Sequence, residues 1–532
     1  MKYGSVMLLL HAHLPFVRHP EHDSFLEEMW LFEAISETYL PILGMLDRLE
    51  RDDVSGSFCI SFSPTLVSML NDELLQNRYI AHLDRLIELG HKECERTIAD
   101  PEFAQPAAMY LDMYTRCRTA FVDTYDRDII ARFRHHAEAG RIQAITTLAS
   151  HPFAPMYQDS DAAIRVQIQV AIHEHTAVFG KRPKGFWLPE CGYYPGIEDL
   201  FDEFGITFFF VAAHALLFGE EPAECGVYAP VQCSNGVLAF GRDMASANAV
   251  WSESEGYPGD PEYREFYRDI GHDLPLDYIA PYIHLQSERI NTGYKYYAIT
   301  GKTDQKRPYL PARASEKAVS HAENFLFKQV RQCRIVGPLM DNVPVVVCPY
   351  DAELFGHWWF EGVQWLEALF RRGHKAAIAD EDWVEFVTPQ QYMQTHNGFQ
   401  VLDPVLSSWG NKGYGEVWLD GSNDWIYRHT HKAVERMIDL VKRYPNETGL
   451  KQRALNQAAR EVLLSQASDW PFIIRSGTAV SYAEARVKEH IRNFTHIYDS
   501  LSGGMISTEW LTKVERRNNC FADIDYRLFG RP

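Results

Sequence analysis

The stretch VVVCPYDAELFGHWWFEG (residues 345–362) changes within a few positions from a run of valines to carboxylates and aromatic side chains. Its first part belongs to the run PVVVC (344–348), which is short, apolar and rich in β-branched residues. Such a run predicts a strand that is buried on both faces. The chain continues with two acids, a histidine and two adjacent tryptophans, namely Asp351, Glu353, His357, Trp358 and Trp359. The stretch therefore predicts a strand that delivers functional side chains to a site.

Six further runs resemble this one, and each is flanked by a longer segment of helical periodicity. They are SVMLLL (5–10), SFCISF (57–62), AITTLA (144–149), KGFWL (184–188), TFFFVA (207–212) and VLAFG (237–241). Periodicity alone does not separate a buried strand from a buried helix, but the shortness and β-branching of the runs favour strands. Short strands that alternate with helices predict an α/β fold built from parallel βα units.

Polar side chains follow most of these runs directly. In chain order they are His11 with His13, then His151, Glu190, His214, Arg242 with Asp243, and finally Asp351 with Glu353. In a βα-barrel the reactive groups lie at the carboxyl ends of the strands, where the loops meet over the central axis. Six strands are therefore predicted to direct polar groups to the same end of the barrel, its mouth, where the carboxyl ends of the strands meet.

Two parts of the chain show helical periodicity without strands. Residues 66–140 read as helix throughout and are too long for a simple crossover, which predicts a helical insertion within the barrel. From about residue 403 amphipathic helical segments replace the strands. We therefore expect a catalytic barrel over residues 1–400, interrupted by the insertion, and an all-helical C-terminal domain over residues 401–532.

Composition and charge exclude several classes of partner. The 532 residues are 46% hydrophobic, which is ample for a large core, and the net charge is -20. Phosphate binding depends on clustered cations, so we exclude nucleic acid as a partner. No apolar run approaches the roughly 20 residues that span a bilayer, so we expect no membrane partner.

The cysteines indicate a reducing compartment. There are nine, an odd number without any C-x-x-C pair, which argues against a disulfide framework and a structural zinc site. The first apolar run is too short to be a secretion signal. We therefore expect a cytoplasmic protein, present as a monomer or a weak homo-oligomer.

Glu190 and Asp351 form the candidate catalytic pair. Each follows a strand, and each is surrounded in sequence by aromatic residues that exclude water and raise the pKa of a neighbouring carboxyl group. Two acids that converge at one mouth suit glycoside hydrolysis or transfer, in which one group attacks and the other supplies a proton. Glu353 competes with Asp351, since residues i and i+2 of an extended segment lie on the same side. The residues alone do not decide between them.

Five motifs resemble, in order, those of glycoside hydrolase family 57, in particular of its 1,4-α-glucan branching enzymes. They are HAHLP (11–15), SHPFAP (150–155), GFWLPECGY (185–193), PYDAELFGHWWFEG (349–362) and SSWGNKGYGEVW (407–418). In the tail, SQASDWPF (465–472) resembles the family's C-terminal helical region. The resemblance thus covers nearly the whole chain.

The resemblance implies a retaining α-glucan enzyme on a (β/α)7 barrel, without a metal or other cofactor. Glu190 falls on the family's nucleophile, and Asp351 rather than Glu353 falls on its general acid/base. The histidines of the donor subsite correspond to His11, His13 and His151. We expect the substrate, which is amylose, glycogen or another α-glucan, also to contact Trp187, His214, Arg242, Trp251, Trp358, Trp409, Trp418, Asp469 and Trp470.

Three alternatives stay open. Some of these branching enzymes carry a long loop, tipped by a tyrosine, that shields the intermediate from water. Residues 214–236 are short here and contain only Tyr228, so an α-amylase-type hydrolase is one alternative. A zinc-dependent polysaccharide deacetylase is a second, because His11 and His13 have a spacing that can ligate a metal. A non-catalytic glucan-binding protein is the third.

Two expectations concern the tryptophans. If Trp409, Trp418 and Trp470 line a glucan track, at least two of them should be partly exposed. His357, Trp358 and Trp359 should begin the helix after the seventh strand. Adjacent helical residues differ by about 100° in direction, so Trp358 and Trp359 cannot both face the site.

Overall fold

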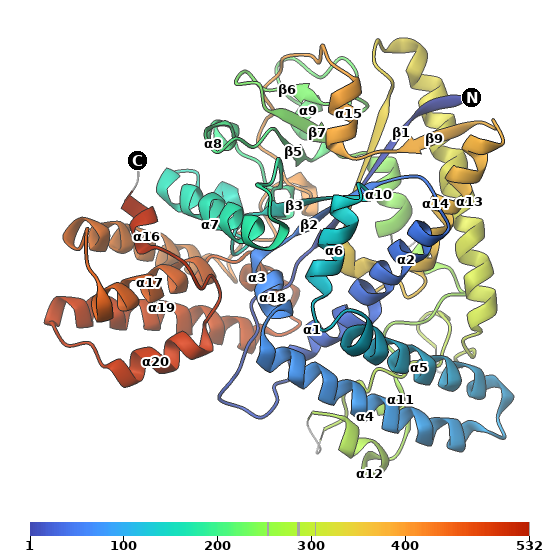
Figure 1. Cartoon of the computed structure of the whole chain (residues 1–532), viewed down its shortest axis with the longest axis horizontal. Coiled ribbons are helices and arrows are strands. Elements are labelled where there is room, and N and C mark those ends of the chain that lie inside the picture. Colours follow the sequence, from blue (N-terminus) through green and yellow to red (C-terminus); the bar gives the residue numbers. More distant parts are fainter. Residues whose placement is uncertain (253–254, 285–287, 304, 531–532) are drawn as a thin grey trace.

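The fold is built around one curled, mainly parallel sheet (Figure 1). It was determined as a computed structural model, which describes residues 1–252, 255–284, 288–303 and 305–530. All seven predicted strands are present in the spatial order β7-β5-β4-β3-β2-β1-β8. Their bounds are β1 (Lys2–Ala12), β2 (Phe58–Phe62), β3 (Ile142–Thr147), β4 (Gly185–Trp187), β5 (Phe208–Val211), β7 (Leu238–Gly241) and β8 (Val345–Asp351).

The two edges of this sheet approach each other, which confirms the (β/α)7 architecture. The backbone N–H of Asp243, just beyond β7, donates to the carbonyl oxygen of Val347 in β8 at 2.9 Å. Two short strands were not predicted: β6 (Val231–Gln232), antiparallel to β7, and β9 (Trp383–Phe386), parallel to β1. A pair of residues is too short to show a pattern, and β9 alternates half-buried with buried residues instead of forming an apolar run.

Alternate residues of each strand serve two cores. In β1, Met7 and Leu9 point inside the barrel, where they join a cluster that contains Phe208, Phe240 and Val347. The residues between them, with the other helix-facing side chains, belong to the larger core under the surrounding helices. Both faces are therefore buried, which explains why the strands read as continuous apolar runs.

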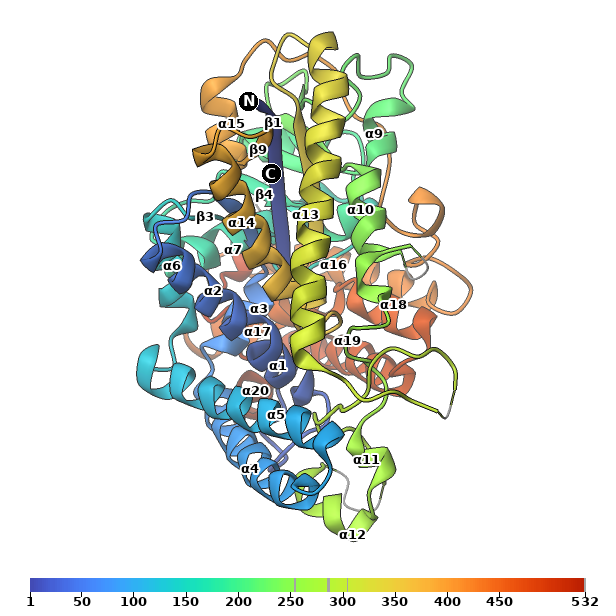
Figure 2. The same cartoon turned by 90° about the vertical axis from the view of Figure 1, so that its right-hand side faces the viewer.

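The helices around the sheet form an outer layer, and Figure 2 shows α13 and α14 running beside β1. Their bounds are α1 (Glu28–Ala34), α2 (Leu40–Arg51), α3 (Pro64–Leu70), α6 (Ile129–Glu138), α7 (Asp161–Phe179), α8 (Ile197–Glu203), α9 (Ala213–Leu217), α10 (Met244–Trp251), α13 (Pro311–Val336), α14 (Gly362–Ile378) and α15 (Pro389–Thr395).

Two insertions project together below the barrel in Figure 1. The first contains α4 (Glu73–Thr97) and α5 (Pro101–Thr119), within the range expected to be helical. The second, between α10 and α13, was not predicted and contains α11 (Ile270–Asp273) and α12 (Leu276–Ile279). Tyr294 of the second insertion donates to the carbonyl oxygen of Leu86 in α4 at 2.6 Å. Helices of four residues leave no periodicity to detect.

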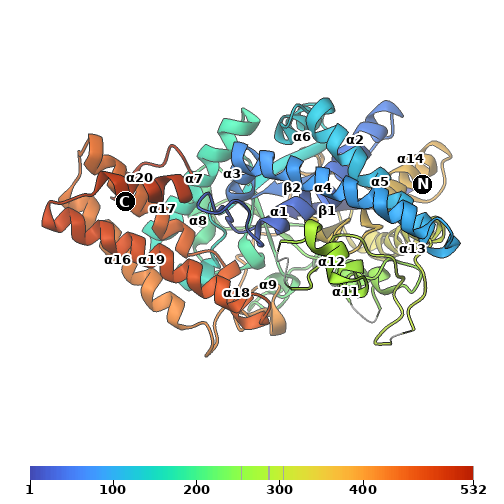
Figure 3. The ribbon, with the colours of Figure 1, turned by 90° about the horizontal axis from the view of Figure 1, so that it is seen from below.

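The C-terminal helices pack on a different side of the barrel from these insertions (Figure 3). They are α16 (Trp425–Arg443), α17 (Gly449–Ser465), α18 (Asp469–Ser476), α19 (Val480–Gly503) and α20 (Thr508–Arg517). The proposed division of the chain near residue 400 stays a prediction. Among the helices of the described residues, none combines the length and the apolar character needed to cross a bilayer.

Candidate active site

The carboxyl ends of the strands carry the candidate catalytic residues. Parallel pairing of β1 with β8 places His11 opposite Asp351, the last residue of β8. Glu190 lies just beyond β4 in a short 3-10 turn (Pro189–Cys191) and has a left-handed backbone, with φ 60° and ψ 20°. This conformation costs free energy in a non-glycine residue and is concentrated at functional sites.

Both carboxylate oxygens of Glu190 accept hydrogen bonds from uncharged donors. The indole Nε1 of Trp409 donates to Oε2 at 2.9 Å, and the hydroxyl of Ser468 donates to Oε1 at 2.9 Å. The backbone N–H of Trp409 also donates to the carbonyl oxygen of Glu190 at 3.0 Å. Burial raises the pKa of Glu190 above its ordinary value, and the two side-chain donors oppose that rise. The carboxylate is thus held in one orientation.

Three histidines stack beside this carboxylate. The ring centroids of His13 and His151 lie 3.8 Å apart, and Nε2 of His11 lies 2.9 Å from Nε2 of His151. Burial lowers the pKa of both His11 and His151 well below the ordinary value, so these rings are neutral. His13 Nε2 hydrogen-bonds Oδ2 of Asp469 at 3.1 Å. Neutral imidazoles offer both donors and acceptors to the hydroxyl groups of a sugar.

Asp351 and Glu353 are two residues apart but have different surroundings. Burial, then the charges of Glu353 and Glu190, raise the pKa of Asp351 well above its ordinary value. Glu353 is occupied, since it accepts hydrogen bonds from the Tyr39 hydroxyl and, at 3.2 Å, from the backbone N–H of His13. Burial raises the pKa of Glu353 to about 7. A free carboxyl group with a raised pKa suits a general acid, which favours Asp351.

Aromatic residues and an arginine line the same mouth. The ring of Trp409 lies 4.8 Å from that of Trp187 and 6.4 Å from that of Trp251. The guanidinium carbon of Arg242 stands 5.2 Å from the centre of the Trp409 ring. Trp187 is buried, whereas Trp251 is 42% exposed and can meet a ligand. The strand ends therefore bring together most of the residues predicted for substrate binding.

Two predicted residues have other contacts. The ring Nε2 of His214 donates to the carbonyl oxygen of Gly413 at 2.7 Å, in the loop that carries Trp409. Trp358 stacks on Phe266 of the second insertion with ring centroids 4.1 Å apart. His214 thus supports the catalytic loop, while Trp358 lies on the side of the site where β8 ends.

The expectation that at least two of the three C-terminal tryptophans are partly exposed is wrong. Only Trp409 is half-buried, whereas Trp418 and Trp470 are each 1% exposed. Trp418 stacks on Phe153 at 4.5 Å, and Trp470 donates its indole N–H to the carbonyl oxygen of Leu464 at 2.9 Å. Trp418 fills the junction with the barrel and Trp470 packs among the C-terminal helices, because large apolar rings gain most from complete burial.

The expectation that His357–Trp359 begin a helix is also wrong, since α14 starts at Gly362 and these residues form a turn. Gly356 has a positive φ of 103°. A Cβ at this position would lie 1.7 Å from the carbonyl oxygen of Glu37, in the turn that connects α1 to α2. The two tryptophans nevertheless differ in exposure, since Trp358 is 51% exposed and Trp359 is 1% exposed.

Two groups of side chains among the described residues could hold a metal ion. They are His13 with His151 and Asp469, and Glu50 with His135 and His136, each with ligand atoms within 4.8 Å of one another. In the first group the rings of His13 and His151 are nearly parallel, at 13°. The nitrogen lone pairs of two stacked rings lie in separate, nearly parallel planes 3.8 Å apart at the ring centres, whereas the ligands of one tetrahedral ion must converge on it. The arrangement fits a sugar better than a metal.

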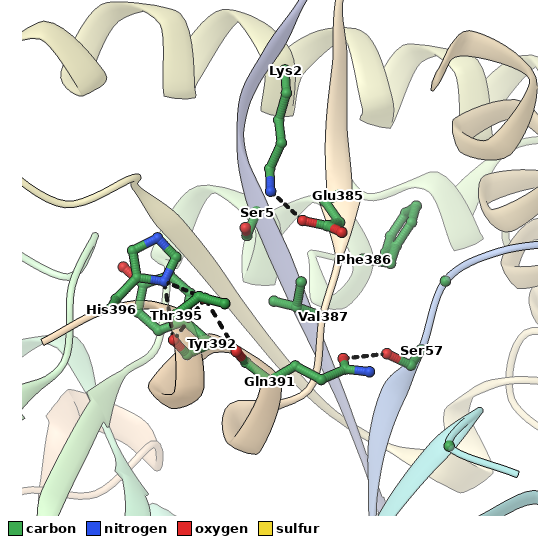
Figure 4. Close-up of a pocket in the computed structure, with 12 residues that line it drawn as sticks. Lys2, Ser5, Ser57, Glu385, Phe386, Val387, Gln391, Tyr392, Thr395 and His396 are labelled. Atoms are coloured by element: carbon green, nitrogen blue, oxygen red, sulfur yellow. Dashed lines mark hydrogen bonds and ion pairs between the residues drawn. The ribbon is translucent and has the colours of Figure 1, made fainter. Parts of the chain in front are cut away.

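A separate cavity of about 500 Å³ lies at the opposite end of the strands (Figure 4). It opens between the beginning of β1, at Lys2 and Ser5, and strand β9. Its polar groups already pair with each other, as Lys2 does with Glu385 and as Ser57 does with Gln391 at 2.6 Å. The carboxyl ends of the strands are where barrel enzymes place their chemistry, so this cavity is not the active site.

Sequence reasoning missed two residues of the site. Ser468 lies between α17 and α18 in the tail, next to the predicted residues Asp469 and Trp470. Tyr39 ends a π-helical turn (Ile35–Tyr39), a rare feature that is concentrated at functional sites and leaves no sequence pattern. Both contacts depend on tertiary packing.

Comparisons with known proteins agree with this geometry. The sequence profile described as glycosyl hydrolase family 57 matches residues 7–404, and that of the 1,4-alpha-glucan branching enzyme C-terminal region matches residues 429–529. The 1,4-alpha-glucan branching enzyme TK1436 of Thermococcus kodakarensis is 32% identical over 98% of this chain and 78% of its own length.

Two solved structures share the whole fold. The alpha-amylase AmyC of Thermotoga maritima is 41% identical with a TM-score of 0.92, and the match covers 100% of both chains. The family 57 branching enzyme of Pyrococcus horikoshii is 29% identical with a TM-score of 0.88, over 99% of this chain and 97% of its own. A curled βα sheet with two half-buried acids at its strand ends defines a carbohydrate-active enzyme of the glycosidase class. The chain belongs to glycosyl hydrolase family 57.

Proposed function

We propose that the chain is a 1,4-α-glucan branching enzyme, which cleaves an α-1,4 linkage and transfers the released chain to a 6-hydroxyl group. The branching-enzyme C-terminal region and the similarity to TK1436 support this choice. Amylose, glycogen or a related α-glucan is the proposed substrate. Such polymers are neutral, so the net charge of -20 does not oppose their binding.

In the first step Glu190 attacks the anomeric carbon while Asp351 protonates the departing glycosidic oxygen. The two donors from Trp409 and Ser468 hold the Glu190 carboxylate ready for attack. The raised pKa of Asp351 lets it keep its proton at a pH where an ordinary aspartate has lost it. The environments of the two acids thus separate their roles, as in other two-carboxylate sites.

In the second step Asp351 removes the proton of the acceptor hydroxyl, which displaces Glu190 and restores the carboxylate. The covalent intermediate makes transfer possible, because the donor chain stays attached while the acceptor binds. His11, His13 and His151 are proposed to bind hydroxyl groups of the donor sugar. Trp251, Trp358 and Trp409 are proposed to stack on the apolar faces of glucose rings.

The observation that carries this proposal is the doubly hydrogen-bonded Glu190 carboxylate at the mouth that also holds Asp351. The test is incubation with amylose, with proton NMR for α-1,6 linkages and a reducing-end assay on the same samples. We expect new α-1,6 linkages from the wild type and none from Glu190→Gln or Asp351→Asn. Amylose binding by Glu190→Gln should persist; full turnover by either variant contradicts the proposed roles.

A mechanism that retains the anomeric configuration also predicts the separation of the two carboxyl groups. The carboxyl groups of Glu190 and Asp351 should stand about 5–5.5 Å apart, since an inverting enzyme needs roughly 6.5–9.5 Å to admit a water molecule. A crystal structure of the enzyme measures this separation directly. A value in the wider range would contradict the covalent intermediate on which transfer depends.

Hydrolysis is the second candidate activity, and the position of Tyr228 favours it. The carbonyl oxygen of Tyr228 accepts from the N–H of Val345, the first residue of β8, and its hydroxyl accepts from Gln332 at 2.8 Å. Asp351 is at the other end of β8, about 20 Å away at 3.3 Å per residue. Tyr228 therefore does not cover the mouth and does not shield the intermediate from water. The similarity to AmyC agrees with this candidate.

We also propose a cytoplasmic location and a mechanism without metal. All nine cysteines are free thiols, as a reducing compartment requires. Metal analysis of the purified enzyme separates this mechanism from that of a zinc-dependent deacetylase. Stoichiometric zinc, together with activity that a chelator abolishes, would favour the deacetylase.

A further inference from the structure

A chain of three hydrogen bonds connects the buried histidines to the candidate nucleophile. Nε2 of His11 lies 2.9 Å from Nε2 of His151, Nδ1 of His151 lies 2.8 Å from the hydroxyl of Ser468, and that hydroxyl lies 2.9 Å from Oε1 of Glu190. Ser468 and His151 are 1% and 3% exposed, so water does not compete with these bonds. The four side chains therefore act as one network.

The chemistry of the groups assigns a direction to every bond in this network. Ser468 has one proton, and it goes to the Glu190 carboxylate, which only accepts. The Ser468 oxygen then accepts from His151, whose Nδ1 must carry the proton of the neutral ring. His151 Nε2 is consequently an acceptor, and His11 Nε2 is the donor to it. The remaining nitrogen of His11, Nδ1, is unprotonated in this assignment, and it has no partner among the described residues to which it would have to donate.

The backbone of Ser468 shows that its hydroxyl is committed to this network. Ser468 occupies the N-cap position of α18, where a serine side chain usually accepts a hydrogen bond from the first turn of the helix. Here its side chain makes no capping bond. Its backbone N–H instead donates to the carbonyl oxygen of His151 at 2.8 Å, which fixes the two residues to each other.

From these contacts we infer that Ser468 is a positioning residue for the nucleophile, and that the His11–His151 pair fixes the direction in which its hydroxyl donates. The inference rests on the proposed role of Glu190. The hydroxyl holds Oε1 while the Trp409 indole holds Oε2, so the carboxylate cannot rotate away from the anomeric carbon. Neutral donors suit this task, because they orient the attacking oxygen without the strong attraction of a full positive charge.

The network also bears on the pH range in which the nucleophile is ionised. The other titratable groups that face Glu190 are Asp351, Asp469, His13, Cys191 and Tyr427. None of these replaces the Ser468 donor at Oε1. Loss of the hydroxyl should therefore raise the pKa of Glu190, because a hydrogen bond to the charged form is lost.

The test compares Ser468→Ala with Ser468→Thr, which keeps a hydroxyl, and with the matched control Ser407→Ala. Ser407 is equally buried, and its hydroxyl has no partner among the described residues. For Ser468→Ala we expect kcat to fall about 10- to 100-fold with little change in KM. We also expect the acidic limb of the pH profile to move up by about one unit. The acidic limb of Ser468→Thr should lie where that of the wild type lies, and Ser407→Ala should not move it.

An unmoved acidic limb in Ser468→Ala would overturn the inference, as would a Thr variant whose limb moves as far as that of the Ala variant. Glu190→Gln separates this failure from failure of the proposed function. If Glu190→Gln is inactive while the acidic limb of the pH profile of Ser468→Ala does not move, only the role proposed for Ser468 is wrong. If Glu190→Gln is active, the proposed nucleophile itself is wrong.

Discussion

The indole N–H of Trp409 donates a 2.9 Å hydrogen bond to Oε2 of Glu190, and so joins the loop before the C-terminal helices to the end of β4. The same two residues are bonded through their backbones at 3.0 Å. The candidate nucleophile is therefore held by a part of the chain more than two hundred residues away in sequence. This contact makes the catalytic site dependent on how the C-terminal region docks.

Replacing Trp409 by Phe should lower kcat about 10- to 100-fold, because it removes the hydrogen bond to Oε2 and keeps an aromatic ring. Steady-state kinetics on amylose measures the effect. Trp365→Phe is the control: Trp365 is fully buried and its indole nitrogen has no partner among the described residues. Equal losses of kcat in the two variants would show that the hydrogen bond does not matter.

Charge removal at two neighbours of Asp351 should move the alkaline limb of the pH profile in opposite directions. The charge of Glu353 raises the pKa of Asp351, and that of Arg242 lowers it. Activity requires protonated Asp351 and is lost as the pH rises through its pKa. Glu353→Gln should therefore shift this limb to lower pH, and Arg242→Gln should shift it to higher pH, each by about one unit. Shifts of the same sign would contradict the assignment of the acid.

The two adjacent tryptophans after β8 should separate activity from stability. Trp359→Ala should reduce the free energy of unfolding by about 3–5 kcal/mol, because it leaves a cavity in the core. Trp358→Ala should change it by about 1 kcal/mol or less, since Trp358 is half exposed, but should raise the KM for amylose. Thermal unfolding measures the change in stability, and steady-state kinetics on amylose measures the change in KM. A Trp358→Ala variant with unchanged KM would remove it from the glucan site.

Hydrolysis should be appreciable alongside modest branching, with short side chains in the product, because Tyr228, the only tyrosine of residues 214–236, does not cover the mouth. Tyr228→Phe should leave the ratio of hydrolysis to branching unchanged, since Tyr228 lies at the far end of β8. New reducing ends and α-1,6 linkages, counted on the same amylose digest, provide the measurement. Abundant branches with almost no new reducing ends would show that another segment closes the site.

Much of the barrel could be predicted, because the information is local. A strand such as β8 is buried on both faces and so appears as an unbroken apolar run, and parallel pairing then brings its last residue, Asp351, to the same edge as His11. The second insertion could not be predicted in this way. Its short helices have no periodic face, and it is ordered by contacts such as that of Tyr294 with α4.

The sequence by itself determined the seven strands and the polar residues at their ends, since burial leaves a pattern in neighbouring residues, but it left Asp351 and Glu353 as alternatives that only the family resemblance separated. Only the tertiary structure decided which groups surround these two acids and Glu190. It brought Ser468 and Trp409 to Glu190, occupied Glu353 with Tyr39, and buried Trp418 and Trp470, which the sequence had suggested for the glucan track. The reason is physical: a hydrogen bond or a ring stack between distant segments depends on where the C-terminal helices dock, and no short stretch of sequence records that position.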